Sequence, residues 1–232
     1  MEDVLYQYAL PYDPLRPQIC FDERPCFLIG DVGAILPMSP GKAKRYHDEY
    51  AKHGSCCVFL AFEPHTGLRY VEVRARRTAV DYAEFMQNLL DKHYAHVECI
   101  RLVQDNLNTH TPGSFYAVLP PGEAFDLSQR FEPHYTPKKG SWLNIAEIEF
   151  AALSTPCLDR RIPAGDTLRQ EVLAWADKRN LDRKTVNWTF SQSHARNKLH
   201  RHYHTTWKVS VFRSREAYAG INTSNTSSHD LP

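Results

Sequence analysis

The chain has 232 residues, of which 42% are hydrophobic and 24% are charged, and these values are ordinary for a globular protein. They exclude collagen-like, coiled-coil and disordered chains, and the length suffices for one large domain or two small ones. There is no apolar run of about 18 residues and no secretory signal, so the sequence predicts a cytoplasmic protein without a membrane segment. Six scattered cysteines without a CxxC pair predict reduced thiols, and the absence of glycine-rich phosphate loops indicates no nucleotide cofactor.

The net charge of +1 conceals an uneven distribution along the chain. Residues 1–150 contain 15 Lys and Arg against 20 Asp and Glu, whereas residues 151–232 contain 13 against 7. The basic excess lies between Arg160 and Arg215. Such asymmetry favours a polyanionic partner at the carboxyl-terminal end, although solvated helix faces are often basic too.

The first half of the chain has the pattern of a β-rich segment. Residues 1–17, rich in Tyr and Pro, predict an irregular lead-in, and the polar residues 37–54 predict a loop or hairpin insertion. The strands expected here are 18–22, 26–30 and a hairpin of 55–64 with 68–74 around the turn His65-Thr66-Gly67.

The second half alternates helices with short strands. A helix capped by Thr78 or Asp81 is expected to run to about His93. The further elements expected are a strand at 98–104, a short helix at 114–119 closed by Pro120-Pro121-Gly122, an edge strand at 130–135, and helices at 141–154, 166–178 and 193–202. Together the elements predict a mixed α/β sheet with helices on its faces.

Three acidic residues are the candidates for chemistry. Asp22 and Asp105 each end a short apolar strand, and Glu147 lies in an expected helix. Taken singly, each has an ordinary structural explanation, since Asp often caps helices or forms turns. Brought together, three carboxylates would repel one another unless a hard cation such as Mg²⁺ or Mn²⁺ neutralised them. Glu149 is about 200° from Glu147 around the helix, and Glu23 points away from Asp22 on the strand, so neither is expected to join them.

Four segments, CFDE, LVQDNLNTH, HYTPKKGSWLNIAEIEF and LDRRIP, resemble the catalytic part of bacterial mariner-like transposases of the "six-thirty" family of insertion sequences. The resemblance covers most of residues 1–208. It implies a ribonuclease H-like mixed five-stranded sheet and a DDE triad of Asp22, Asp105 and Glu147 that holds two Mg²⁺ or Mn²⁺ ions, with Asp22 bridging both. The Trp-Leu-Asn before Glu147 matches the signature that sets the third acid. Asn108 and His110 match the DNLNTH motif, but no catalytic role is assigned to them.

The resemblance also implies a domain organisation and partners. We expect a lead-in at 1–17, a catalytic domain at 18–208 and a disordered tail at 209–232. Full members of the family carry an N-terminal helix-turn-helix domain, and because only 21 residues precede Asp22 we expect this domain to be absent here. The implied partners are transposon-end and target DNA, a separate helix-turn-helix protein and a second transposase copy, in a bacterial cytoplasm and at the nucleoid when DNA is bound.

Two basic groups are candidates for DNA contact. Lys138 and Lys139 lie just before the Glu147 helix, where they could hold a phosphate near the acids. Arg196, Lys198 and Arg201 form a basic stretch near the carboxyl-terminal end. A solvated helix face explains these cations equally well.

The function expected from these observations is metal-dependent DNA strand cleavage and strand transfer. Two alternatives stay open. One is a structure-selective nuclease on the same fold that cuts RNA–DNA hybrids or junctions. The other is a decayed or captured fragment that binds DNA or a partner transposase without catalysis.

Overall fold

The computed structural model describes residues 1–32, 40–41 and 49–201. The chain divides into two compact units, of which one holds Met1 and Asp3–Trp188 and the other Glu2 and Thr189–Pro232. Most of the expected 37–54 insertion and the whole 209–232 tail lie outside the described residues. Among the residues that are described, no helix combines the length and hydropathy needed to cross a membrane.

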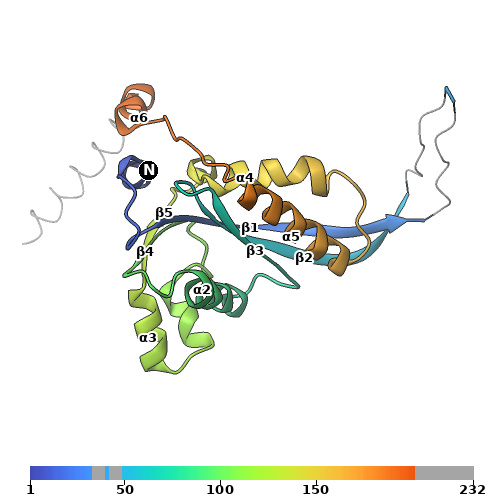
Figure 1. Ribbon diagram of the computed structural model, residues 1–232, viewed down its shortest axis with the longest axis horizontal. Helices are drawn as coiled ribbons and strands as arrows, with labels where there is room; N and C mark the ends of the chain where they lie inside the picture. Colours follow the sequence, from blue (N-terminus) through green and yellow to red (C-terminus); the bar gives the residue numbers. More distant parts are fainter. Residues whose placement is uncertain (33–39, 42–48, 202–232) are drawn as a thin grey trace, which may run out of the picture. The chain divides into compact units, whose positions relative to one another are not determined.

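The first unit is built on a five-stranded sheet with the order β3-β2-β1-β4-β5 (Figure 1). The antiparallel pairs are β1 with β2 and β2 with β3, while β4 runs parallel to both β1 and β5. The expected mixed sheet is therefore confirmed. The strands are β1 (Gln18–Asp31), β2 (Tyr50–Glu63), β3 (Leu68–Arg74), β4 (Ile100–Gln104) and β5 (Phe131–Tyr135).

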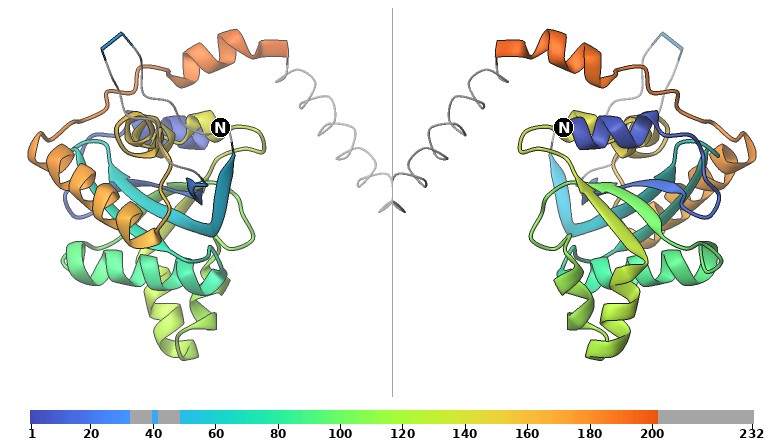
Figure 2. Two further views of the ribbon diagram at one scale, coloured as in Figure 1. Left: turned by 90° about the vertical axis from the view of Figure 1, so that its right-hand side faces the viewer. Right: turned by 90° about the vertical axis from the view of Figure 1, so that its left-hand side faces the viewer.

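Helices cover both faces of this sheet. Figures 1 and 2 show α2 (Ala79–His93) and α3 (Pro121–Gln129) on one face, and α4 (Ala146–Leu153) and α5 (Gly165–Leu181) on the other. The remaining helical segments of this unit are α1 (Glu2–Ala9), η1 (Pro112–Ala117), η2 (Ser141–Leu143) and η3 (Ser154–Leu158). The second unit contains α6 (Gln192–Lys198).

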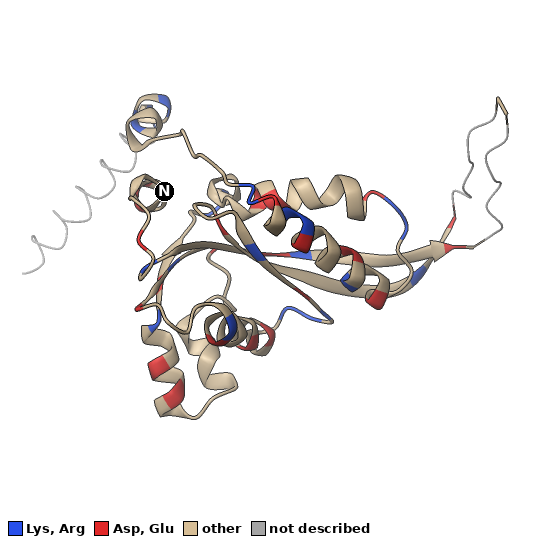
Figure 3. Ribbon diagram, in the orientation of Figure 1, with Lys and Arg blue, Asp and Glu red and all other residues tan. Residues whose placement is uncertain are grey.

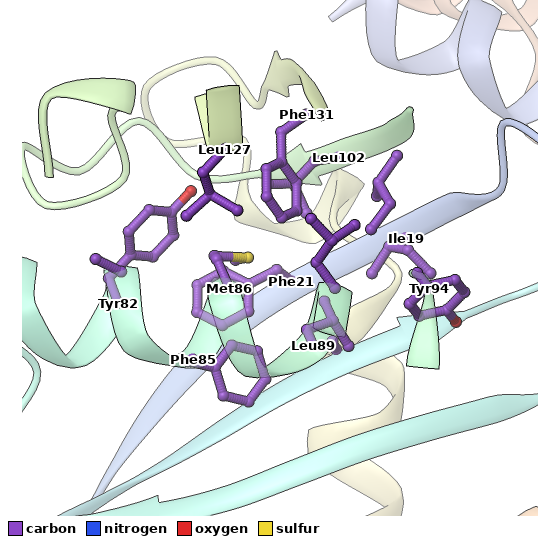
Figure 4. Close-up of a cluster of buried hydrophobic side chains, with 14 of the residues drawn as sticks. Ile19, Phe21, Tyr82, Phe85, Met86, Leu89, Tyr94, Leu102, Leu127 and Phe131 are labelled. Carbon is purple, nitrogen blue, oxygen red and sulfur yellow. The ribbon is translucent and has the colours of Figure 1, made fainter. Parts of the chain in front are cut away.

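The main core lies between the sheet and α2. Phe21 from β1 contacts Phe59 of β2 and Phe85 and Tyr82 of α2, with ring centroids 5.2–5.9 Å apart (Figure 4). Burying each such side chain contributes about 1.5–3 kcal/mol before entropy is counted. The amphipathic α2 begins as expected, because Thr78 and Asp81 form a reciprocal capping box. This core holds β1 firmly at the point where Asp22 follows Phe21.

Three local features differ from the expectations. The lead-in contains the helix α1, because Val4 and Leu5 are buried and tertiary packing overrides the Pro-rich context. The two short strands expected at 18–30 are one strand, β1, which continues through Pro25. Around Pro25, β1 pairs with β2 but not with β4, because the ladder with β4 covers only residues 18–20. One edge of β1 is therefore unpaired at this point, and proline is tolerated at an unpaired strand edge. The helical segment before Pro120 does end there, as expected, but the same prolines begin the helix α3, which the sequence did not predict, with Pro121 in its first turn.

Candidate active site

Asp22 lies on β1 on the face opposite the aromatic core. Its neighbours Phe21 and Glu23 are buried on the α2 side, so strand alternation directs Asp22 toward the α4 side. The Asp22 Oδ1 atom accepts a hydrogen bond from the backbone N–H of Glu23 at 2.9 Å.

Asp105 directly follows the fully buried strand β4. The strands β1 and β4 are parallel neighbours, and Cys20 lies opposite Val103. Asp22 and Asp105, which each follow this pair by two residues, therefore lie toward the same edge of the sheet. This edge, beyond the carboxyl ends of parallel strands, is where α/β sheets collect ligands.

Asn144 fixes the position of α4 against β1. Its buried Nδ2 donates to the Phe21 carbonyl oxygen at 2.7 Å, one residue before Asp22, and its Oδ1 accepts from the Ala146 N–H at 3.2 Å. The Glu147 N–H in turn donates to the Asn144 carbonyl at 3.1 Å. The side chain of Asn144 thus links the first turn of α4, which carries Glu147, to the strand that carries Asp22.

Glu149, the other acid of this helix, pairs with two arginines instead of facing Asp22. Its side chain is fully buried and forms ion pairs with Arg69 at 2.7 Å and with Arg179 at 2.8 Å. Glu147, in contrast, is exposed. The expectation that the two acids face different environments is confirmed.

The three candidate acids act on one another electrostatically. Burial, followed by the negative charges of Glu147 and Asp105, raises the pKa of Asp22 to about 7, against the hydrogen bond from the Glu23 backbone. Near pH 7 this carboxyl group is about half protonated, because both its burial and its negatively charged neighbours disfavour the ionised form.

The donor chemistry of this site fits a divalent cation. Asp22, Asp105 and Glu147 offer only carboxylate oxygens, which Mg²⁺ and Mn²⁺ prefer, and a cation would relieve the repulsion that raises the pKa of Asp22. In residues 1–32, 40–41 and 49–201, no three or more His, Cys, Asp or Glu side chains form a group that could hold a metal ion. Within the described residues the three acids therefore interact electrostatically but do not form a complete metal-binding group.

His110, for which the sequence predicts no role, contacts the site from the α2 side. Its Nδ1 lies 2.5 Å from Asp105 Oδ1, and its Nε2 lies 2.7 Å from Glu23 Oε2. Neither oxygen has a hydrogen-bond partner of good geometry, so both contacts are described as ion pairs. Burial lowers the pKa of His110, but the contacts with Asp105 and Glu23 and their negative charges outweigh it and raise the pKa to about 9. Glu23 does point away from Asp22, as expected, yet it reaches Asp105 through this imidazole.

Asn108 lines a hollow beside these acids. The hollow has a volume of about 320 Å³. The residues that line it are Glu23, Arg77, Asn106, Leu107, Asn108 and Thr109.

The candidate DNA-binding cations fall in both units. Lys138 and Lys139 are exposed and follow β5, whose end is in register with that of β4, so they leave the sheet at the same edge as Asp105. Figure 3 shows acidic residues on α3. Arg196 and Lys198 lie in the last turn of α6 and Arg201 follows it, all three exposed in the second unit.

Comparisons with known proteins agree with this architecture. Residues 17–169 match the family model described as DDE superfamily endonuclease. The fold is similar to that in the crystal structure of the Mos1 mariner paired end complex with Mn, with a TM-score of 0.52 and 14% identity over 75% of this chain and 52% of that one. The Mos1 strand transfer complex gives the same TM-score and identity over 75% of this chain and 51% of that one. The chain thus spans about half the length of these proteins, and the likeness confirms the ribonuclease H-like fold. Among curated proteins, none matches the sequence.

Proposed function

Because the chain belongs to the DDE superfamily endonucleases, we propose that it is a transposase catalytic domain that cleaves DNA strands and transfers them in a metal-dependent reaction. The observation that carries this proposal is geometric: in a chain of an endonuclease family, Asp22 on β1 and Asp105 after β4 lie toward the same sheet edge, and Asn144 links the first turn of α4, which carries Glu147, to β1. Burial and then the charges of Glu147 and Asp105 raise the pKa of Asp22 to about 7, which agrees with this placement. A structural role alone does not explain three acids from three elements near one sheet edge, because their repulsion is unfavourable without a cation.

Asp22, Asp105 and Glu147 would hold two Mg²⁺ or Mn²⁺ ions. Two such ions, when bound, activate the attacking water or DNA 3′-hydroxyl and stabilise the leaving oxygen of an in-line displacement. A bound cation would favour the ionised form of Asp22, whose pKa burial and the neighbouring carboxylates raise. Asn144 keeps Glu147 near Asp22 through the Phe21 carbonyl. Lys138 and Lys139 would hold a phosphate at the same sheet edge.

The finer assignment is part of the same proposal. The segments LVQDNLNTH and SWLNIAEIEF support membership of the bacterial "six-thirty" insertion-sequence group. In that group we expect the partners to be transposon-end and target DNA, a second copy of the chain and a helix-turn-helix domain in this or another chain.

The test is cleavage of end-labelled duplex DNA in Mg²⁺ or Mn²⁺. Asp22→Asn, Asp105→Asn and Glu147→Gln keep the shape of each side chain and remove a charge, so each should abolish cleavage. The exposed acids of α3 provide matched controls, and Asp126→Asn and Glu123→Gln should cleave like the wild type.

The same assay separates the alternatives. Cleavage of RNA–DNA hybrids or junctions in preference to duplex DNA would indicate the structure-selective nuclease. DNA binding without metal and without cleavage of any substrate would indicate a non-catalytic fragment. Full activity of Glu147→Gln would contradict the proposed triad.

A further inference from the structure

One buried imidazole joins the carboxylates of two different strands. His110 Nδ1 lies 2.5 Å from Asp105 Oδ1, and His110 Nε2 lies 2.7 Å from Glu23 Oε2. The side chains of His110 and Glu23 are 1% and 2% exposed, whereas that of Asp105 is 31% exposed. The imidazole therefore lies between the buried carboxylate of Glu23 on β1 and the partly exposed carboxylate of Asp105 at the end of β4.

The ring of His110 has little freedom to move. It stacks on Tyr82 with a centroid distance of 4.9 Å and an interplanar angle of 27°, and its edge meets Phe21 at 5.2 Å and 73°. The backbone carbonyl of His110 accepts hydrogen bonds from Gln104 Nε2 at 3.1 Å and from Tyr135 Oη at 3.0 Å. Aromatic packing and backbone hydrogen bonds thus fix the imidazole independently of the two carboxylates.

This arrangement restricts how Asp105 can turn. The contact with His110 holds Oδ1 against the imidazole, so Oδ2 is the oxygen left for another ligand. Without the imidazole, an Asp at the start of a loop would sample several rotamers. Partners that orient a ligating carboxylate typically change metal affinity or activity by about 10–100-fold when they are removed.

We propose that His110 is a positioning residue that holds Asp105 in its cation-binding orientation, with Glu23 as the buried anchor on the opposite side of the ring. The inference rests on the proposed function, since it gives Asp105 the role of a cation ligand. It gives a functional role to two residues outside the triad, Glu23 and His110.

The test measures binding of Mn²⁺ alone to the full chain by calorimetry, without DNA. His110→Phe keeps a ring against Tyr82 and removes the contact with Asp105, but it leaves Glu23 buried without its partner. The double variant His110→Phe/Glu23→Gln removes that buried charge as well, so it should fold even where the single variant is unstable. We expect both to bind Mn²⁺ about 10–100-fold more weakly than the wild type.

A second buried histidine provides the matched control. His134 on β5 pairs through Nδ1 with Asp3 Oδ2 at 2.9 Å and is 7% exposed. His134→Phe should therefore leave the affinity for Mn²⁺ unchanged.

The outcomes separate this inference from the proposed function. Wild-type Mn²⁺ affinity in the double variant would show that His110 only stabilises the fold, and would overturn the positioning role while leaving the triad intact. A wild-type chain that neither binds Mn²⁺ nor cleaves DNA would overturn the proposed function and this inference with it. Weak binding in the double variant beside normal binding in His134→Phe would support the positioning role.

Discussion

At the scale of single residues, Asp22 makes the stability of the protein depend on pH. Its pKa is about 7 in the folded chain and about 3.9 when unfolded, because burial and then the Glu147 carboxylate disfavour its ionised form. The folded state therefore holds this proton more tightly, and the resulting stabilisation, complete below about pH 4, is lost as the pH rises through 7. Asp22→Asn should remove that loss.

We expect Asp22→Asn to be more stable than the wild type at pH 8 in a chelator. The gain is on the order of 2 kcal/mol after a discount for partial exposure, or about 4–8 °C in Tm. Near pH 4 the two proteins should have the same Tm. Thermal unfolding of both proteins at pH 4 and pH 8 measures the difference. Asp126→Asn on the exposed face of α3 serves as the control. A variant less stable than the wild type at pH 8 would show that Asp22 is stabilised as an anion.

Single residues also show how far the sequence can identify the site. Asp22 and Asp105 are identifiable because a charged residue ends an apolar run, and Glu147 because of its motif. The pairing of His110 with Glu23 is not identifiable in this way, since 87 positions separate them in the chain. Their contact exists only because β4 lies beside β1, so that the loop after β4 folds back over Glu23. The one local sign is a histidine that ends the polar segment after Asp105.

At the scale of elements, a buried ionic network fixes α4 to β3 and α5. The fully buried Glu149 forms ion pairs with Arg69 and Arg179, and Arg69 also donates hydrogen bonds to the carbonyl oxygens of Gly67 and Lys184. Glu149→Gln would leave Arg69 buried without its counter-charge, and such losses cost about 3–5 kcal/mol.

The measurement is the free energy of unfolding in urea. Glu171→Gln is the control, because its pair with Arg160 lies at 2.5 Å between half-exposed side chains, and such surface pairs contribute about 0–1 kcal/mol. Similar losses in the two variants would mean that Glu149 adds no more than a surface ion pair.

The first turn of α4 gives a prediction for activity. Asn144 holds this turn to the Phe21 carbonyl at 2.7 Å, so Asn144→Ala should free Glu147 to move relative to Asp22. We expect kcat for cleavage to fall by about 10²-fold, the usual effect of displacing a reactive group by about 1 Å, while DNA affinity changes little. Gln129→Ala, an exposed amide truncation on α3, should leave both unchanged. Equal losses in kcat and DNA affinity would indicate general unfolding of the region.

Elements differ in how well the sequence predicts them. The periodic, capped helix α2 and the hairpin of β2 and β3 follow local rules, including a φ of 70° at Gly67 in the turn. The helices α1 and α3 do not, because Pro and Tyr around them favour loops and their burial depends on distant partners. Val4 and Leu5, for example, have no local signal that they will be covered.

At the scale of the whole molecule, the distribution of charge determines how the chain should bind DNA. Lys138 and Lys139 are exposed at the sheet edge of the candidate site, and phosphate contacts from such side chains carry no sequence information. The 232-residue chain should therefore bind unrelated duplexes alike, with a Kd on the order of 10⁻⁴ to 10⁻⁶ M at physiological salt and a steep salt dependence.

Neutralising the sheet-edge lysines should weaken binding to every duplex and flatten its salt dependence. For Lys138→Gln/Lys139→Gln, the slope of log K against log salt should fall in magnitude by about 0.9 for each lost phosphate contact. Lys92→Gln/Lys178→Gln, on exposed positions of α2 and α5, is the matched control and should keep the wild-type slope. The measurement is a salt-titrated binding assay with several unrelated duplexes and a randomised pool. Enrichment of one sequence from that pool by more than about 10³-fold would mean that the chain reads bases itself, because such ratios belong to sequence-specific binders.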